Sequence, residues 1–118
     1  MDRRLAKELM HLQDWLDLAS EIVASGKAKY LADPLLQEAG DSLMMKIGEL
    51  ARRMTQKGIE PPKSVAWADA VANRNWVIHQ YDEIDREVTW NTLSISVLEW
   101  RVLFDSEFAA ARDFLNER

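Results

Sequence analysis

Four polar side chains interrupt an apolar helical pattern at Arg74, Asn75, His79 and Tyr81. The apolar seam that precedes them at helical spacing comprises Val65, Ala68 and Ala72. Asn75 and His79 continue this seam as i, i+4 neighbours, and Arg74 lies about 140° from His79 around an ideal helix. Polar groups on an inward-facing seam are unfavourable unless they are paired. The pattern therefore requires internal hydrogen bonds, a partner surface or a chemical function.

Two of these residues are suited to chemistry on phosphates. His79 suits proton transfer, because an imidazole has a reference pKa of about 6.5. The planar guanidinium of Arg74 can donate two parallel hydrogen bonds to a phosphate. A structural role stays open: a histidine in a last helical turn meets the helix dipole favourably, and Arg74 can pair with a carboxylate of another helix. Tyr81 can equally be a packed aromatic with its hydroxyl in water.

Other candidate sites are weaker. Asp82, Glu83 and Asp85 form an acidic cluster that helix termination and N-capping explain better than a cation site, because hard cations need more oxygen ligands. We interpret His11, beside an apolar stripe, as structural. The sequence shows no phosphate-binding glycine loop, serine elbow or zinc-binding histidine pair. We therefore expect neither a metal site nor a cofactor.

One stretch of this acidic chain is basic. Its lysines and arginines outnumber the two acidic residues Glu49 and Glu60, and they are Lys46, Arg52, Arg53, Lys57 and Lys63. We interpret this stretch as a solvated helix face unless it adjoins Arg74.

The elements that carry these residues are all predicted to be helices. Glycine and proline are scarce, and apolar residues recur at helical spacing between them. The four predicted helices run from Arg3 to Ala24, from an Asp33 cap to Gly58, from Ser64 to Tyr81, and from an Asp85 cap to near the C-terminus. The fold class is therefore all-α, an antiparallel bundle of four main helices in a single domain over residues 1–118.

The fourth predicted helix carries more apolar surface than one neighbour needs. Its main stripe comprises Leu93, Val97, Trp100, Phe104, Phe108, Ala111 and Leu115. A second apolar face comprises Val88, Ile95 and Val102. We expect more than one neighbour to pack on this helix. The leftover apolar surface, with the polar seam of the third helix, predicts a homodimer whose twofold interface includes the third helix.

Composition excludes several classes of protein. The chain has 118 residues, 47% of them hydrophobic, which favours one globular domain over a disordered chain. It has no cysteine and therefore no disulfide or thiolate metal site. No apolar run approaches the length of a membrane span, and the charged N-terminus is unlike a signal peptide, so we expect a cytoplasmic protein. The net charge of −5 opposes general attraction to nucleic acid, so RNA binding would need a local basic patch.

Residues 74–81 read R-N-W-V-I-H-Q-Y, which resembles the R-N-x-x-x-H-x-Y signature of HepT-like toxins in the HEPN superfamily of helical ribonucleases. The resemblance extends to Glu38-Ala39, to Trp67, and to residues 82–85 and 88–91. It covers residues 33–95 by motif and the whole chain by helix pattern. Arginine, asparagine, histidine and tyrosine of the core motif are all present.

The resemblance implies a ribonuclease toxin of a type VII-like toxin–antitoxin pair. In such an enzyme Arg74, Asn75 and His79 are the catalytic residues, and cleavage needs no metal. It also implies a nucleotidyltransferase-fold antitoxin that transfers AMP to Tyr81. Each chain supplies one motif histidine, so a homodimer would supply two to one cleft.

Two other interpretations stay open. The chain can be a non-catalytic helical partner that presents Tyr81 or a groove to a nucleotidyltransferase. It can also be an interaction protein in which the motif only stabilises a dimer. RNA cleavage in the presence of a chelator distinguishes the first interpretation from both.

Overall fold

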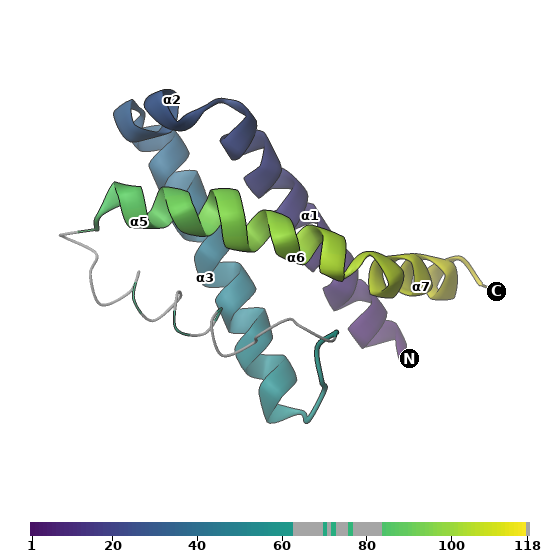
Figure 1. Ribbon diagram of the computed structural model, residues 1–118. Coiled ribbons are helices and arrows are strands. Elements are labelled where there is room, and N and C mark those ends of the chain that lie inside the picture. Colours follow the sequence, from purple (N-terminus) through teal and green to yellow (C-terminus); the bar gives the residue numbers. More distant parts are fainter. Residues whose placement is uncertain (63–69, 71, 73–75, 77–83, 118) are drawn as a thin grey trace.

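The computed structural model describes residues 1–62, 70, 72, 76 and 84–117 (Figure 1). Its elements are α1 (Arg3–Ala24), α2 (Lys27–Ala32), α3 (Pro34–Gln56), α5 (Arg86–Asn91), the π-helical segment η1 (Thr92–Val97), α6 (Leu98–Leu103) and α7 (Asp105–Asn116). The predicted all-α fold class is confirmed. The predicted third helix lies largely outside the described residues, although the backbone is helical at Ala70, Ala72 and Trp76.

The first two long helices begin and end where their capping residues predict. The chain turns at Gly26, whose φ of 95° favours glycine, directly after α1. Asp33 caps α3 by accepting a hydrogen bond from the Leu35 N–H at 2.9 Å, and Pro34 occupies the first helical position. These local signals set the length of α1 and α3, which form the frame of the bundle.

The short helix α2 was not predicted. It has only six residues, too few for a visible helical period, and it is held by Tyr30, which is fully buried. Gly40 of α3 makes room for this packing: a Cβ there would lie 2.9 Å from Cδ1 of Leu93 and 3.7 Å from the Tyr30 ring. Gly40 therefore permits the close approach of Leu93 and Tyr30 to α3.

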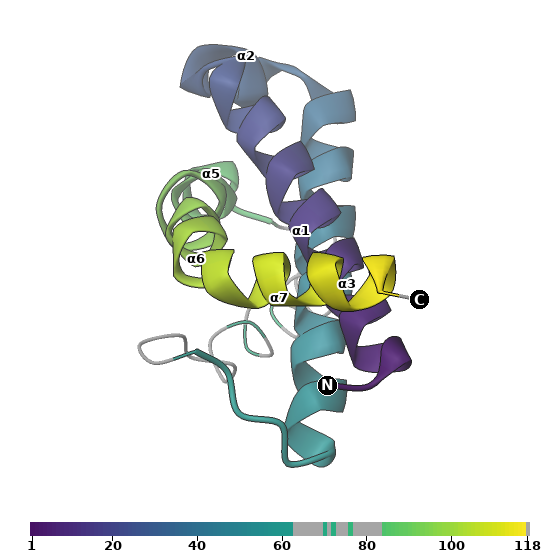
Figure 2. The ribbon, with the colours of Figure 1, turned by 90° about the vertical axis from the view of Figure 1, so that its right-hand side faces the viewer.

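The helices pack in two groups around one core. α1 and α3 run in opposite directions, and the continuous stretch α5–η1–α6 crosses them (Figure 1). Figure 2 shows α5 and α6 on one side of the α1–α3 pair, and α7 packs against α1, which it crosses. The largest fully buried side chains are Tyr30, Phe104, Phe108, Leu12, Leu16, Leu50, Met54, Leu93 and Thr89. They come from α1, α2, α3, α5, η1, α7 and the junction at Phe104, so the elements share one core.

The π-helical segment η1 keeps three buried side chains on the same face of the helical stretch. Thr89, Leu93 and Val97 are all buried, and they are spaced by four residues. In an α-helix each step of four residues turns a side chain about 40° away from the previous one. The wider i→i+5 turns of η1 reduce this rotation, so all three side chains face the core.

The prediction of one continuous helix after Asp85 is wrong at Phe104. The chain leaves helical geometry there, with ψ of 2°, and α7 then runs across the view of Figure 2 while α5 is seen nearly end-on. Phe104 is buried, and its ring stacks on Phe108 at 5.5 Å between centroids. The bend lets α7 pack against α1 while both phenylalanines stay in the core.

The second apolar face of this stretch is exposed in the part of the chain that the structure describes. Val88, Ile95 and Val102 are 45%, 63% and 75% exposed and are spaced by seven residues. More than one neighbour packs on this stretch, as expected, since α1, α2 and α3 all contact it, but these three side chains stay exposed among the described residues. The three side chains form an exposed apolar row along α5, η1 and α6, which we call the apolar row.

Candidate functional site

The predicted site residues Arg74, Asn75, His79 and Tyr81 lie outside the described residues. Three described positions belong to the same predicted helix. Ala70 is buried, and Trp76 is half-buried and packs against the core. Ala72 is exposed, although the sequence pattern places it on an inward seam. At this position, the seam that Asn75 and His79 continue is therefore not covered by the described core.

The chain leaves α3 toward the motif through a fixed turn. Gly58 adopts a φ of 71°, as expected for the glycine that ends α3, and the Ile59 N–H donates to the Met54 carbonyl at 2.9 Å. Ile59 is half-buried and packs against the core. The start of the connection to the motif is thus attached to the C-terminal end of α3.

On the other side of the motif, a salt bridge attaches the chain to α3 again. Arg86, at the start of α5, donates hydrogen bonds to both carboxylate oxygens of Asp41, at 2.7 and 3.0 Å. The side chains of Arg86 and Asp41 are only 22% and 7% exposed. These hydrogen bonds raise the pKa of the Arg86 guanidinium above its usual value. A bidentate, largely buried pair fixes both position and orientation.

Two hydroxyl groups extend this attachment to α2. The Tyr30 hydroxyl and the Thr89 hydroxyl lie 2.6 Å apart in the core, and Thr89 Oγ1 also donates to the Arg86 carbonyl at 3.1 Å. The Tyr30 ring contacts Trp90 at 5.5 Å between centroids. We call the four residues Tyr30, Asp41, Arg86 and Thr89 the anchor. It joins α2, α3 and α5 five residues after Tyr81 of the motif.

The anchor was missed by the sequence analysis. Asp41 and Arg86 are 45 residues apart, and no local pattern pairs them. One signal was present: Asp41 lies at helical spacing with Met44, Gly48 and Ala51, all of which are buried. An acidic residue on that face needs a partner, because an unpaired buried carboxylate is strongly unfavourable.

The weaker candidates have structural roles where they are described. Asp85 caps α5 by accepting a hydrogen bond from the Glu87 N–H at 3.0 Å, as predicted, while Asp82 and Glu83 lie outside the described residues. His11 is exposed and stacks on Trp15, one turn along α1. Within the described part of the chain, no three His, Asp or Glu side chains are grouped as a metal site. The helices described there include none with the length and apolarity of a membrane span.

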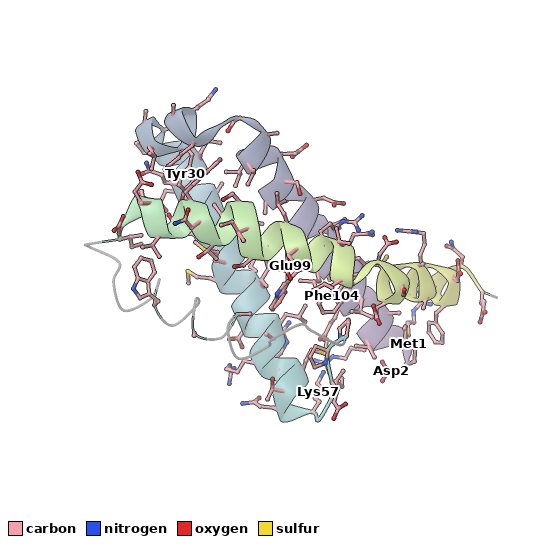
Figure 3. All side chains as sticks on the ribbon, viewed as in Figure 1. Met1, Asp2, Tyr30, Lys57, Glu99 and Phe104 are labelled. Carbon is pink, nitrogen blue, oxygen red and sulfur yellow. The ribbon has the colours of Figure 1, made fainter. Side chains whose placement is uncertain are left out.

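The basic stretch of the sequence lies on the C-terminal half of α3, next to the start of α1. Figure 3 shows Lys57 at the end of α3 that is remote from Tyr30, near Met1 and Asp2. Arg52 donates to Glu49 at 2.6 and 3.2 Å, which raises the pKa of Arg52 above its usual value. The predicted basic residue Lys63 lies outside the described residues.

Comparison with known proteins gives one finding. The family model described as Ribonuclease HepT-like matches residues 12–102. This range includes most of α1, all of the elements from α2 to α5, η1, and the residues of the motif. No curated protein and no solved structure matches the chain.

Proposed function

Since the chain belongs to the HepT-like ribonuclease family, we propose that it is a metal-independent endoribonuclease with Arg74, Asn75 and His79 as its catalytic residues. The observation that carries the proposal is the family match over residues 12–102, which encloses an intact R-N-x-x-x-H-x-Y motif. The acidic chain offers no general attraction to RNA, so its action on RNA depends on local groups.

The proposed reaction uses the ribose 2′-hydroxyl as its nucleophile. One group removes the 2′-hydroxyl proton, a second stabilises the charge that develops on the phosphorane, and a third protonates the leaving oxygen. His79 transfers protons, and Arg74 pairs with the phosphate oxygens. Asn75 orients the histidine or the phosphate. Atoms and charges balance without a metal, because the proton removed from the 2′-hydroxyl is matched by one given to the leaving oxygen.

This reaction is best served by two histidines, and a homodimer supplies them. A twofold interface that includes the motif helix brings both His79 residues to one cleft. Two observations support a second copy as the missing neighbour. First, Ala72 is exposed, although it lies on the seam of the motif helix that is predicted to face inward. Second, the exposed apolar row begins at Val88, seven residues after Tyr81. A second copy would cover apolar side chains that this chain leaves in water.

The proposed setting is a type VII-like toxin–antitoxin pair. The chain acts as a single domain over residues 1–118, and its α1 and α7 helices, from opposite ends of the sequence, pack together. The proposed partner is a nucleotidyltransferase-fold antitoxin that transfers AMP from ATP to the Tyr81 hydroxyl and releases pyrophosphate. The added nucleotide places negative charge near Arg74 and His79, where it opposes RNA binding.

Cleavage of RNA in the presence of EDTA tests the proposal. The purified chain is incubated with labelled single-stranded RNA, with and without chelator, beside the His79→Ala variant. We expect cleavage that survives EDTA and is abolished in His79→Ala, while circular dichroism of the variant stays native. Equal rates in both proteins would contradict the assignment of His79. A chain that binds the nucleotidyltransferase but never cleaves RNA would instead be the non-catalytic partner.

A further inference from the structure

Basic side chains gather where the start of α1 meets the end of α3. Arg4 of α1 and Arg53 and Lys57 of α3 converge on one carboxylate oxygen, Oε1 of Glu8. The distances to this oxygen are 3.7 Å from Arg4 Nε, 3.9 Å from Arg53 Nε and 3.9 Å from Lys57 Nζ. Arg52 lies beside them, paired with Glu49. We call Arg4, Arg52, Arg53 and Lys57 the basic cluster.

The basic cluster carries more positive charge than its carboxylates neutralise. Among the described residues its four cations pair with two carboxylates, Glu8 and Glu49, so these six groups together carry a charge of about +2 in a chain whose net charge is −5. Glu8 sits at ion-pair distances that exceed those of a good hydrogen bond. Glu8 is shared among three cations and Glu49 between Arg52 and Arg53, so the cluster keeps electrostatic capacity for another anion.

The cations of the cluster are exposed to solvent, whereas the Glu8 carboxylate with which three of them pair is largely buried. The side chain of Glu8 is only 13% exposed, and its Oε2 is buried without a hydrogen-bond partner among the described residues. The Arg4 side chain, in contrast, is 76% exposed. A charged molecule approaching this surface therefore meets guanidinium and ammonium groups before it meets Glu8.

Lys46 extends the cluster along α3. Lys46, Arg53 and Lys57 are separated by seven and four residues, which places them within about 20° to 40° of one another around the helix. Lys46 is exposed. At about 1.5 Å per residue, the three cations span about 16 Å of the helix. A row of separate cations of this length matches a chain of phosphates better than it matches a single small anion.

We propose that the basic cluster and Lys46 bind the phosphate backbone of single-stranded RNA. This inference rests on the proposed ribonuclease function and names the part of its substrate that this surface holds. Arginine pairs with phosphate through two parallel hydrogen bonds, and lysine acts as a point charge. Contacts of these groups to phosphate carry no information about the bases, so the surface holds RNA independently of its sequence. The chain leads from Lys57 into the motif segment, with Arg74 seventeen residues further on.

A binding titration with RNA that cannot be cleaved tests the proposal. The probe is a fluorescein-labelled 2′-O-methyl RNA of about 15 nucleotides, which lacks the 2′-hydroxyl nucleophile, and fluorescence anisotropy gives Kd over a range of salt concentrations. The double variant Arg53→Gln/Lys57→Gln removes two cations from the cluster. The matched control Lys27→Gln/Lys29→Gln removes two cations from α2, which lies at the other end of α3 (Figure 1).

We expect the cluster variant to weaken binding at least tenfold near 50 mM salt. For single strands, each phosphate contact makes the slope of log K against log salt more negative by about 0.7. Losing two contacts should therefore make the slope shallower by about 1.4. The control should change Kd less than twofold and keep the slope. Thermal unfolding of both variants establishes that they are folded.

The outcomes separate this proposal from the proposed function. If the native chain cleaves RNA but the two double variants bind alike, the basic cluster does not hold RNA and the ribonuclease function stands. If binding depends on the cluster but the native chain cleaves nothing, the surface assignment stands and the ribonuclease function fails. Displacement of the RNA by polyglutamate at equal charge concentration would overturn the assignment of the surface to phosphates.

Discussion

The guanidinium of Arg86 donates two hydrogen bonds to the carboxylate of Asp41, which lies 45 residues earlier in the sequence. The pair ties the start of α5 to α3 only five residues after Tyr81. Thr89 and Tyr30 reinforce the same joint through their hydroxyl groups. The segment with the predicted catalytic residues thus returns to the bundle at a position fixed by buried polar contacts.

Loss of one partner of this pair should destabilise the protein strongly. Asp41→Ala leaves the Arg86 guanidinium largely buried without its carboxylate, and breaking such a pair costs about 3 kcal/mol or more. Urea unfolding followed by circular dichroism measures the change. Asp17→Ala is the control, because Asp17 pairs with Arg101 at 2.6 Å but is 55% exposed, and exposed pairs contribute less than about 1 kcal/mol. Equal losses in both variants would contradict the role of burial.

A charge in the middle of the apolar row should dissociate the proposed homodimer. Ile95 is 63% exposed between Val88 and Val102, so Ile95→Asp removes little packing among the described residues but places a charge in the proposed interface. Sedimentation velocity at micromolar concentration should show a dimer for the native chain and a monomer for the variant. Leu35→Asp, at an 81% exposed position of α3, should remain dimeric. A monomeric native chain would overturn the dimer and the shared catalytic cleft with it.

Removal of Arg74 should slow the chemical step more than it weakens RNA binding. A donor that stabilises the charged transition state is worth about 3 kcal/mol, which corresponds to a rate about a hundredfold lower. Single-turnover cleavage of a defined RNA measures this rate for the native chain and for Arg74→Ala. Arg112→Ala, on α7, is a control that removes the same charge and should cleave at the native rate. A native rate in Arg74→Ala would exclude the proposed role.

Tyr81 should be the acceptor of AMP in the presence of the proposed antitoxin. Intact mass spectrometry after incubation with a neighbouring nucleotidyltransferase and ATP should show the added AMP on the native chain and not on Tyr81→Phe. The modified chain should lose RNA cleavage, because its phosphate competes for Arg74 and repels the substrate. Tyr81→Phe should keep cleaving, since the hydroxyl has no part in the proposed chemistry. A mass gain that persists in Tyr81→Phe would place the modification elsewhere.

Local signals in the sequence predicted the parts of the fold that local interactions determine. The caps at Asp33 and Asp85 and the turns at Gly26 and Gly58 depend on residues within one helical turn, so they could be read directly. The bend at Phe104 could not, because the apolar stripe continues through it without a change of period. It follows from the packing of α7 against α1, which joins distant parts of the chain.

In the candidate site, too, the features within one short segment could be predicted from the sequence, and the contacts between distant segments could not. The motif is a short pattern of residue types, and its resemblance to HepT-like toxins agrees with the family match over residues 12–102. The Asp41–Arg86 pair and the convergence of Arg4, Arg53 and Lys57 on Glu8 depend on how α1, α3 and α5 meet in space. Spacing along one helix carries no information about such contacts.

The packing of α7 against α1 has a consequence for how the chain folds during synthesis. The inner face of α1 is made first, but the helix that covers much of it lies about 100 residues later in the sequence. At about 5–20 residues per second, a ribosome needs about 5 to 20 seconds to make this stretch. Throughout that time α1 lacks Phe108 and Ala111, the residues that α7 adds to the shared core. The nascent chain completes its core only after α7 has left the exit tunnel.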